Sequence, residues 1–339
     1  MRPEKLEKLY SILAGKRTLL ILTHDNPDPD AIASGLALKH LLGKVENLSC
    51  TLAYSGLIGR AENKAMVSEL GIEISPFENL VVDNFEALAL VDTQPRFGNI
   101  SLPPNREPLV VVDHHNRKGR APRAAFWDIR EDYGATSTIM YEYLRTARMG
   151  IDTRLATALF YAIKSETQDL GREAGLVDKE AYFSLFTMSE PTWIYSIANA
   201  SVPREFFTNY SRAIDSTTIH DQAICTTLGE VQYPDLVAEV ADMMLKMEKI
   251  QWSFCSGIFE TRLLVSIRTT NLATDCSDII VRMLRHVGSA GGHDMMAGGK
   301  IEVGNVSATD RRGLEMRLRA RFLKQISMPI RGERLVGKK

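Results

Sequence analysis

The segment Val110-Val111-Val112-Asp113-His114-His115 constrains the fold of this chain more than any other. Its run of β-branched apolar residues is typical of a strand buried on both faces, as in a parallel sheet covered by helices. The run ends in one carboxylate and two imidazoles. Because ligands bind beyond the carboxyl ends of the strands in open α/β sheets, these polar residues indicate a site at that edge.

Two other apolar runs also end in carboxylates, and one of them brings a histidine. Thr18–Leu22 leads into Thr23-His24-Asp25-Asn26-Pro27-Asp28-Pro29-Asp30, and Ala87–Val91 leads into Asp92. If the three strands are neighbours, their polar ends converge in one crevice: His24, Asp28, Asp30, Asp92, Asp113 and His114. So many carboxylates require neutralising cations, and carboxylate with imidazole but no cysteine suits Mn²⁺, Mg²⁺ or Fe²⁺. The ligands are too many for one ion, which predicts a two-metal site.

The chain has 339 residues, enough for two domains. Strands alternate with helices in the first part, which predicts an α/β fold with a doubly wound parallel sheet in residues 1–190. The pattern weakens over 191–215, which we interpret as a linker. A smaller α/β domain is expected at 216–339, with a helix capped by Ser277 and a last helix over 309–324. We expect the active site in the cleft between the domains.

Composition limits the partners. The 41 Lys and Arg residues nearly cancel the 42 Asp and Glu residues, which argues against a groove for long duplex nucleic acid. The apolar runs are too short to span a bilayer, and the first residues do not form a signal peptide. The four cysteines have no paired spacing, so we expect free thiols in a cytoplasmic protein without a membrane partner. A homodimer is compatible with the sequence.

These motifs together resemble the DHH phosphoesterase superfamily, and within it the nanoRNase and pAp-phosphatase-like branch with a DHH-associated C-terminal domain. Thr23–Ala31 matches the first family motif, Asp92 the second and Asp113-His114-His115 the third. Gly291-Gly292-His293, with Ala297-Gly298, matches the glycine-rich motif of the C-terminal domain. The four motifs occur in order, and the resemblance covers nearly the whole chain.

The resemblance implies two Mn²⁺ ions, with Mg²⁺ or another divalent ion as the alternative. His24 and Asp28 would hold one ion, and Asp30 and His114 the other. Asp92 would bridge both ions. As the catalytic pair, Asp113 would support the site and His115 would face the phosphate.

One motif departs from the family pattern. The fourth motif is usually Thr-Asp-Thr, and Ser165-Glu166-Thr167 stands at the aligned positions. Glu166 would then replace an aspartate ligand of the second metal, on a side chain that is one methylene longer. Asp169 is the alternative ligand, although its register fits less well.

Simpler structural roles exist for several of these residues. Asp28 or Asp30 could cap the helix that begins near Ala31. The glycines of Gly288–Gly299 could form a helix C-cap and a turn, and Arg268 could be an arginine exposed at the end of a strand. The resemblance favours substrate contacts for four residues: Arg268, Gly291, Gly292 and His293.

We therefore expect Mn²⁺-dependent, two-metal hydrolysis of phosphoester bonds in short nucleotides. The substrates would be short oligoribonucleotides, linear dinucleotides such as pApA, or pAp. A stand-alone cyclic-dinucleotide phosphodiesterase is the first alternative. A degenerate member that binds nucleotide without hydrolysis is the second, and Glu166 is its support in the sequence.

Overall fold

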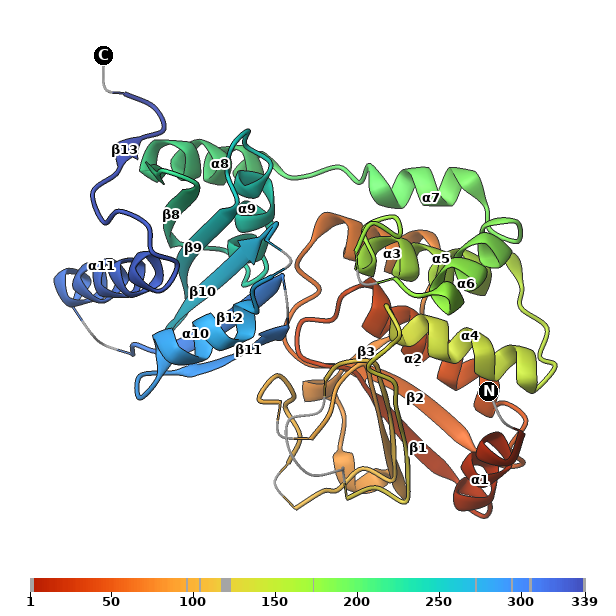
Figure 1. The fold of residues 1–339 in the computed structure, drawn as a ribbon. Helices are drawn as coiled ribbons and strands as arrows, with labels where there is room; N and C mark the ends of the chain where they lie inside the picture. Colours follow the sequence, from red (N-terminus) through yellow and green to blue (C-terminus); the bar gives the residue numbers. More distant parts are fainter. Residues whose placement is uncertain are drawn as a thin grey trace. The chain divides into compact units, whose positions relative to one another are not determined.

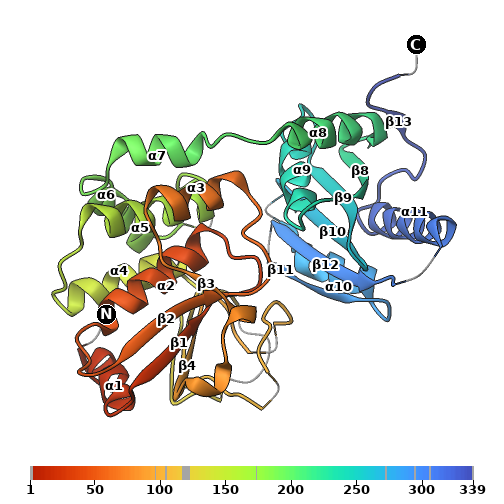
Figure 2. The same cartoon turned by 180° about the vertical axis from the view of Figure 1, so that it is seen from behind.

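The computed structural model describes residues 3–337 except 96, 104, 117–122, 173, 272, 294 and 305–306. The chain divides into two compact units, Met1–Ser201 and Val202–Lys339, here called the N-terminal and C-terminal units. Figure 1 shows the N-terminal unit from red to green and the C-terminal unit from green to blue, and Figure 2 shows both from behind.

The N-terminal unit is built on a six-stranded sheet with the order β3-β2-β1-β4-β5-β6. Every pairing in it is parallel. This is a doubly wound order, so the predicted fold class is confirmed. The strands are β1 (Thr18–Leu22), β2 (Ser49–Tyr54), β3 (Ser75–Pro76), β4 (Ala87–Val91), β5 (Val110–Asp113) and β6 (Phe126–Ile129).

The two faces of this sheet have different covers. Leu19 and Ile21 of β1 pack into a core formed with the helices, whereas Leu20 and Leu22 point to the opposite face. There they pack against a segment between residues 77 and 124 that contains two 3₁₀ turns, η1 (Phe77–Asn79) and η2 (Val82–Asn84). The helices of this unit are α1 (Pro3–Leu13), α2 (Pro29–Leu42), α3 (Ala61–Glu69), α4 (Thr136–Thr146), α5 (Thr153–Glu166), α6 (Leu176–Phe186) and α7 (Pro191–Ala198).

The sheet order reverses between β1 and β4, which lie side by side with β5 next to β4. The chain leaves β1 toward His24, leaves β4 at Asp92 and leaves β5 at His114. Parallel strands end at the same edge, so these three exits lie together. A reversal of strand order opens a crevice at that edge, and ligands of doubly wound sheets bind in it.

The C-terminal unit is a mixed sheet with the order β11-β12-β10-β9-β8-β7-β13. β8 and β9 pair in parallel, and the other pairings are antiparallel. One apolar core joins the sheet to α10 and α11, and a second joins it to α8 and α9. The elements are α8 (Arg204–Ser216), β7 (Thr218–His220), β8 (Ala223–Glu230), α9 (Leu236–Leu245), β9 (Trp252–Phe259), β10 (Arg262–Thr269), α10 (Cys276–Leu284), β11 (Ser289–His293), β12 (Met296–Glu302), α11 (Ala308–Gln325) and β13 (Glu333–Arg334).

Three local expectations differ from the structure. The boundary between the units, at Ser201 and Val202, falls in the range 191–215 that we interpret as a linker. Most of that range is helical, in α7 and in all but the last residue of α8, because their apolar residues pack into the cores of their own units. The cap of α10 is Asp275, whose side chain accepts from the N–H of Ser277, so the prediction of Ser277 as the cap is wrong. The glycine-rich segment forms a β-hairpin, β11–β12, because its glycines allow two backbones to approach closely.

All four cysteines are free, as predicted, and three of them are buried. Among the described residues, no helix is both long enough and apolar enough to cross a membrane.

Candidate metal centre

The polar strand ends meet around the carboxylate of Asp92. Its Oδ2 lies 3.7 Å from Nε2 of His24, which in turn lies 3.5 Å from Oδ2 of Asp28. Its Oδ1 lies 3.7 Å from Nε2 of His114, which lies 4.0 Å from Oδ2 of Asp30. These separations are too long for hydrogen bonds, but they suit ligand atoms that share a cation at about 2.1 Å from each. The two oxygens of one carboxylate therefore face two separate groups of donors.

Asp92 has an unusual backbone. Its φ is 59°, in the left-handed region, although it is not a glycine. Its N–H donates to the carbonyl of Val112 on the neighbouring strand, at 2.9 Å. Left-handed backbone at a non-glycine residue costs on the order of 1–3 kcal/mol and persists where the surroundings enforce it, commonly at functional sites. This turn directs the Asp92 side chain into the crevice.

Both candidate histidine ligands have one ring nitrogen fixed by the backbone. Nδ1 of His24 lies 2.9 Å from the carbonyl of Asp25, and Nδ1 of His114 lies 3.0 Å from the carbonyl of Tyr133. A carbonyl can only accept, so each Nδ1 carries the proton and each Nε2 presents a lone pair to the carboxylates. Metal-binding histidines are usually fixed in this way.

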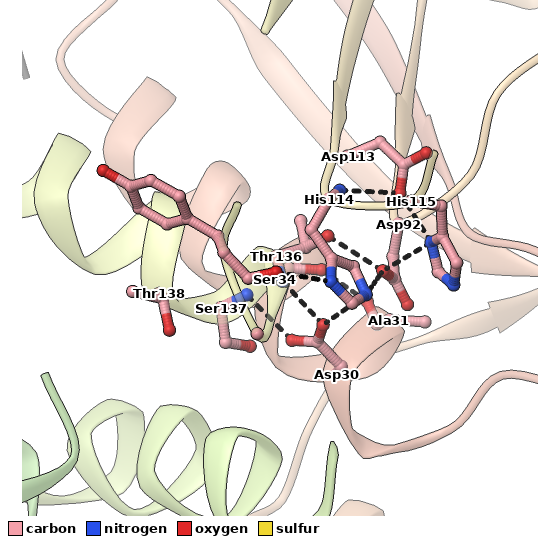
Figure 3. Close-up of polar contacts among 12 residues, drawn as sticks. Asp30, Ala31, Ser34, Asp92, Asp113, His114, His115, Thr136, Ser137 and Thr138 are labelled. Carbon is pink, nitrogen blue, oxygen red and sulfur yellow. Dashed lines mark hydrogen bonds and ion pairs between the residues drawn. The ribbon is translucent and has the colours of Figure 1, made fainter. Parts of the chain in front are cut away.

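Asp28 and Asp30 each combine a capping role with a place in the crevice. Asp28 is the N-cap of α2 and accepts from the N–H of Ala31 at 3.0 Å. Asp30 accepts from the N–H groups of Thr136 and Ser137, at 2.7 and 2.8 Å, and so caps the first turn of α4. Figure 3 shows Asp30 between these donors and His114. The capping role and the site role thus coexist in both residues.

Asp113 orients His115. Its Oδ1 accepts from Nδ1 of His115 at 2.8 Å and from the N–H of His114 at 2.9 Å. Its Oδ2 accepts from Nε2 of Gln94 at 2.7 Å, and that same nitrogen donates to the carbonyl of His115 at 2.9 Å. Because Nδ1 of His115 donates to Asp113, its Nε2 lies on the far side of the ring. Asp113 is fully buried and acts through His115.

The carboxylates strongly perturb one another. Burial and the charge of Asp28 raise the pKa of Asp30 to about 6. Burial and the charges of Asp30 and Asp28 raise the pKa of Asp92 well above its usual value. Burial opposes a positive charge on His115, but the Asp113 carboxylate outweighs burial and raises the pKa of His115 to about 9. Divalent cations would remove this repulsion, so the donor set fits bound metal.

Glu166 and Asp169 lie in different surroundings. Glu166 is the last residue of α5, and burial and the charges of Asp28 and Asp30 raise its pKa to about 8. Asp169 is exposed, and it binds Nζ of Lys164 through both oxygens at 2.5 Å and accepts from the hydroxyl of Tyr182 at 2.9 Å. These contacts favour Glu166 as the ligand.

The predicted substrate residues lie in the C-terminal unit. Arg268, near the end of β10, donates from Nε to Oδ1 of Asp242 at 2.5 Å and from Nη1 to Oγ of Ser266 at 2.7 Å. It is therefore a buried arginine held by its own domain, not a freely exposed one. Gly291 and Gly292 lie in β11, where Gly292 has a φ of +151° and pairs with Ala297. The side chain of His293 lies outside the described part of the structure.

Several residues that support the site were not predicted from the sequence. Gln94 follows the β4 exit by two residues, and Thr136 and Ser137 open α4. The segment Gly134-Ala135-Thr136-Ser137 is typical of a helix start, but a helix start alone does not reveal that its first N–H groups bind a carboxylate more than a hundred residues earlier.

A doubly wound sheet whose strand exits hold buried carboxylates and imidazoles around one shared carboxylate is the arrangement of a metal-dependent phosphoesterase, a hydrolase. Two family models match the chain: the DHH family, N-terminal domain, over residues 18–163, and the DHHA1 domain over residues 221–311. The chain belongs to the DHH family and carries the DHHA1 domain, so the family predicted from the sequence is confirmed.

Several individual proteins are similar to this chain. An uncharacterized protein of Methanocaldococcus jannaschii is 34% identical over 333 residues, which are 96% of this chain and 67% of that protein. A probable manganese-dependent inorganic pyrophosphatase of Lactobacillus delbrueckii subsp. bulgaricus is 27% identical over 165 residues, 48% of this chain and 52% of that protein. The crystal structure of an exopolyphosphatase-related protein from Bacteroides fragilis has the same fold, with a TM-score of 0.71 at 13% identity, and the match covers 96% of this chain and 98% of that one.

Proposed function

We propose that this protein hydrolyses phosphoester bonds in short nucleotides with the help of two divalent cations, preferably Mn²⁺. The observation that carries the proposal is the Asp92 carboxylate, whose two oxygens face His24 on one side and His114 on the other, each at 3.7 Å. One bridging carboxylate between two donor groups is what a two-metal site requires. The similarity to a probable manganese-dependent pyrophosphatase supports the choice of metal.

We propose separate roles for the residues of the centre. His24 and Asp28 would hold one cation, and Asp30, His114 and Glu166 would hold the other. Asp92 would bind both cations. When bound, the two cations stabilise charge on the phosphoryl oxygens and activate water for attack. The carboxylate of Asp113 holds His115 and raises its pKa to about 9, and His115 would donate a hydrogen bond to a phosphoryl oxygen.

Nucleotides are favoured over inorganic pyrophosphate because the chain carries the DHHA1 domain over residues 221–311. The similarity to the pyrophosphatase spans only 48% of the chain. The additional domain offers a buried arginine, Arg268, and a hairpin of backbone N–H groups to bind the rest of a substrate. Recognition beyond a single phosphate is the role we propose for this domain, as predicted from the sequence.

The test is a substrate panel with the full chain, first stripped of metal and then supplied with Mn²⁺ or Mg²⁺. The panel contains oligoribonucleotides of two to five residues, pApA, pAp, a cyclic dinucleotide, inorganic pyrophosphate and bis-p-nitrophenyl phosphate. We expect Mn²⁺-dependent turnover of one or more of the linear short nucleotides. Preference for the cyclic dinucleotide would support the alternative phosphodiesterase function, and preference for pyrophosphate would contradict the role of the C-terminal unit. Nucleotide binding without turnover would identify a degenerate member.

A further inference from the structure

We propose that Thr136, the first residue of α4, is a positioning residue that holds the Asp92 carboxylate in its bridging orientation. The inference rests on the proposed two-metal function and adds a residue to it. The hydroxyl Oγ1 of Thr136 donates to Oδ1 of Asp92 at 2.8 Å, and both side chains are buried. Figure 3 shows the two side chains facing each other beside His114.

A bridging carboxylate must keep its plane fixed. Oδ1 of Asp92 faces His114, and Oδ2 faces His24. The left-handed backbone and the N–H bond to Val112 fix the main chain of Asp92, but they leave rotation about the bond to the carboxylate. Within the described part of the chain, the hydrogen bond from Thr136 is the one that this carboxylate receives. At 2.8 Å it is shorter than the 3.7 Å separations between this carboxylate and the nitrogens of His24, His114 and His115, so we infer that it sets which way the two oxygens point.

Thr136 also contacts a second candidate ligand. Its backbone N–H donates to Oδ2 of Asp30 at 2.7 Å, while its hydroxyl binds Asp92. One residue thus sets the spacing between two carboxylates that would share a cation with His114. The backbone contact survives any substitution except proline, whereas the hydroxyl contact depends on the side chain. A substitution can therefore remove the contact with Asp92 and keep the contact with Asp30.

The turn that carries Thr136 is itself anchored. Asp178 of α6 is fully buried and accepts from the N–H of Gly134 at 2.9 Å, from the N–H of Gly175 at 2.8 Å and from Oγ1 of Thr138 at 2.6 Å. Gly134 and Thr138 lie on either side of Thr136, so Asp178 holds this turn from both sides, and its bond to Gly175 ties the turn to the start of α6. The position of Thr136 is therefore set by the protein and does not depend on metal.

The experiment compares three variants of the full chain. Thr136→Val keeps the shape and loses the hydroxyl, and Thr136→Ser keeps the hydroxyl. Thr138→Val is the matched control, because it removes an equally buried hydroxyl in the same turn of α4 while the backbone bond from Gly134 keeps the turn attached to Asp178. Each protein is stripped of metal, checked by thermal unfolding and titrated with Mn²⁺ by calorimetry. Paramagnetic resonance then distinguishes a coupled pair of Mn²⁺ ions from isolated ions.

We expect Thr136→Val to bind Mn²⁺ about 10–100-fold more weakly, the usual effect of removing an outer-sphere partner, and to lose the signal of the coupled pair. Thr136→Ser and Thr138→Val should resemble the unsubstituted protein in both measurements. Two coupled ions bound normally by Thr136→Val would overturn the inference, and so would an equal loss in Thr138→Val. If Thr136→Val does not fold, Thr136→Ala is judged by the same titration. An unsubstituted protein that binds fewer than two ions would contradict the proposed function instead.

Discussion

At the scale of single residues, the candidate centre depends on carboxylates that serve two purposes. Asp28 caps α2 and faces His24, Asp30 caps α4 and faces His114, and Asp92 lies between the two histidines. Substitutions at Asp28 or Asp30 therefore affect both folding and metal binding. Asp92 caps no helix, so a substitution there can test metal binding apart from folding.

Asp92→Asn removes the shared negative charge and keeps the size of the side chain. We expect turnover of any Mn²⁺-dependent substrate to fall by at least about 10³-fold, a loss of about 4 kcal/mol of transition-state stabilisation. The unfolding temperature of the metal-free variant should not be lower than that of the metal-free unsubstituted protein, because the substitution removes one charge that repels its neighbours. Near-normal activity would remove Asp92 from the bridging role.

Paired substitutions can decide whether Glu166 or Asp169 is the ligand of the second cation. The charges of Asp28 and Asp30 act on Glu166, whereas Asp169 binds Lys164 and Tyr182. Glu166→Gln should therefore weaken binding of the second Mn²⁺ about 10-fold or more, and Asp169→Asn should change it little. Glu166→Asp should keep or raise activity, since it restores the family residue. A calorimetric titration with Mn²⁺ measures the ranking, and the reverse order would assign the ligand to Asp169.

The raised pKa values predict how pH affects the metal-free protein. The folded-state pKa values of Asp30 (about 6) and Glu166 (about 8) lie above unfolded values of about 4. Their contribution to stability is therefore fully present below about pH 4 and is lost as the pH rises through 6 and 8. His115, raised to about 9, acts in the same direction.

The unfolding temperature in chelator should therefore fall from pH 5 to pH 9, and added Mn²⁺ should reduce or reverse the fall. Glu166→Gln should flatten the fall between about pH 5 and pH 8 in chelator, because the slope from this carboxyl lies between its unfolded and folded pKa values. A metal-free protein that becomes more stable over this range would contradict the repulsion among the carboxylates.

At the scale of elements, the sequence predicts some strands well and others not at all. β1, β4 and β5 are continuous apolar runs, and their polar exits predicted most of the centre. β9 was missed because Trp252–Phe259 mixes aromatic residues with serines and a glycine, and its burial comes from helices on both faces of the sheet. The role of the Thr136 hydroxyl could not be predicted from the sequence either, since its contact with Asp92 depends on the packing of α4 against the sheet.

The hairpin β11–β12 offers a test at this scale. Gly292 has a φ of +151°, and a Cβ there would lie 2.4 Å from Cα of Ala297. Gly292→Ala should therefore destabilise the C-terminal unit by about 1–3 kcal/mol, the usual cost of overpacking. Gly298→Ala is the control, because its Cβ would make an ordinary contact of 3.6 Å with the carbonyl of Val265. Denaturant unfolding measures both, and equal effects would mean that the close approach is not needed.

At the scale of the whole molecule, we propose that chemistry and recognition belong to different units. The candidate ligands all precede Ser201, whereas Arg268 and the glycine hairpin follow Val202. Arg268→Ala and His293→Ala should keep Mn²⁺ binding and lose kcat/KM on a dinucleotide about 10-fold or more, the scale of a charge-assisted hydrogen bond. Bis-p-nitrophenyl phosphate should be much less affected. Equal losses on both substrates would contradict this division of labour.

The capping of α4 by Asp30 has a further consequence for the order in which the centre assembles. Asp30 and Thr136 are more than a hundred residues apart, and the exits of β4 and β5 lie between them. In an unfolded chain His24, Asp28 and Asp30 stay close in sequence, but Asp92 and His114 do not, so the bridged pair of cation sites cannot form before the sheet does. Mn²⁺ should leave the refolding rate of the chain nearly unchanged and slow its unfolding, because it binds only the completed structure. Stopped-flow refolding and unfolding, each with Mn²⁺ or with chelator, would separate the two rates, and faster refolding in Mn²⁺ would show that the centre forms early.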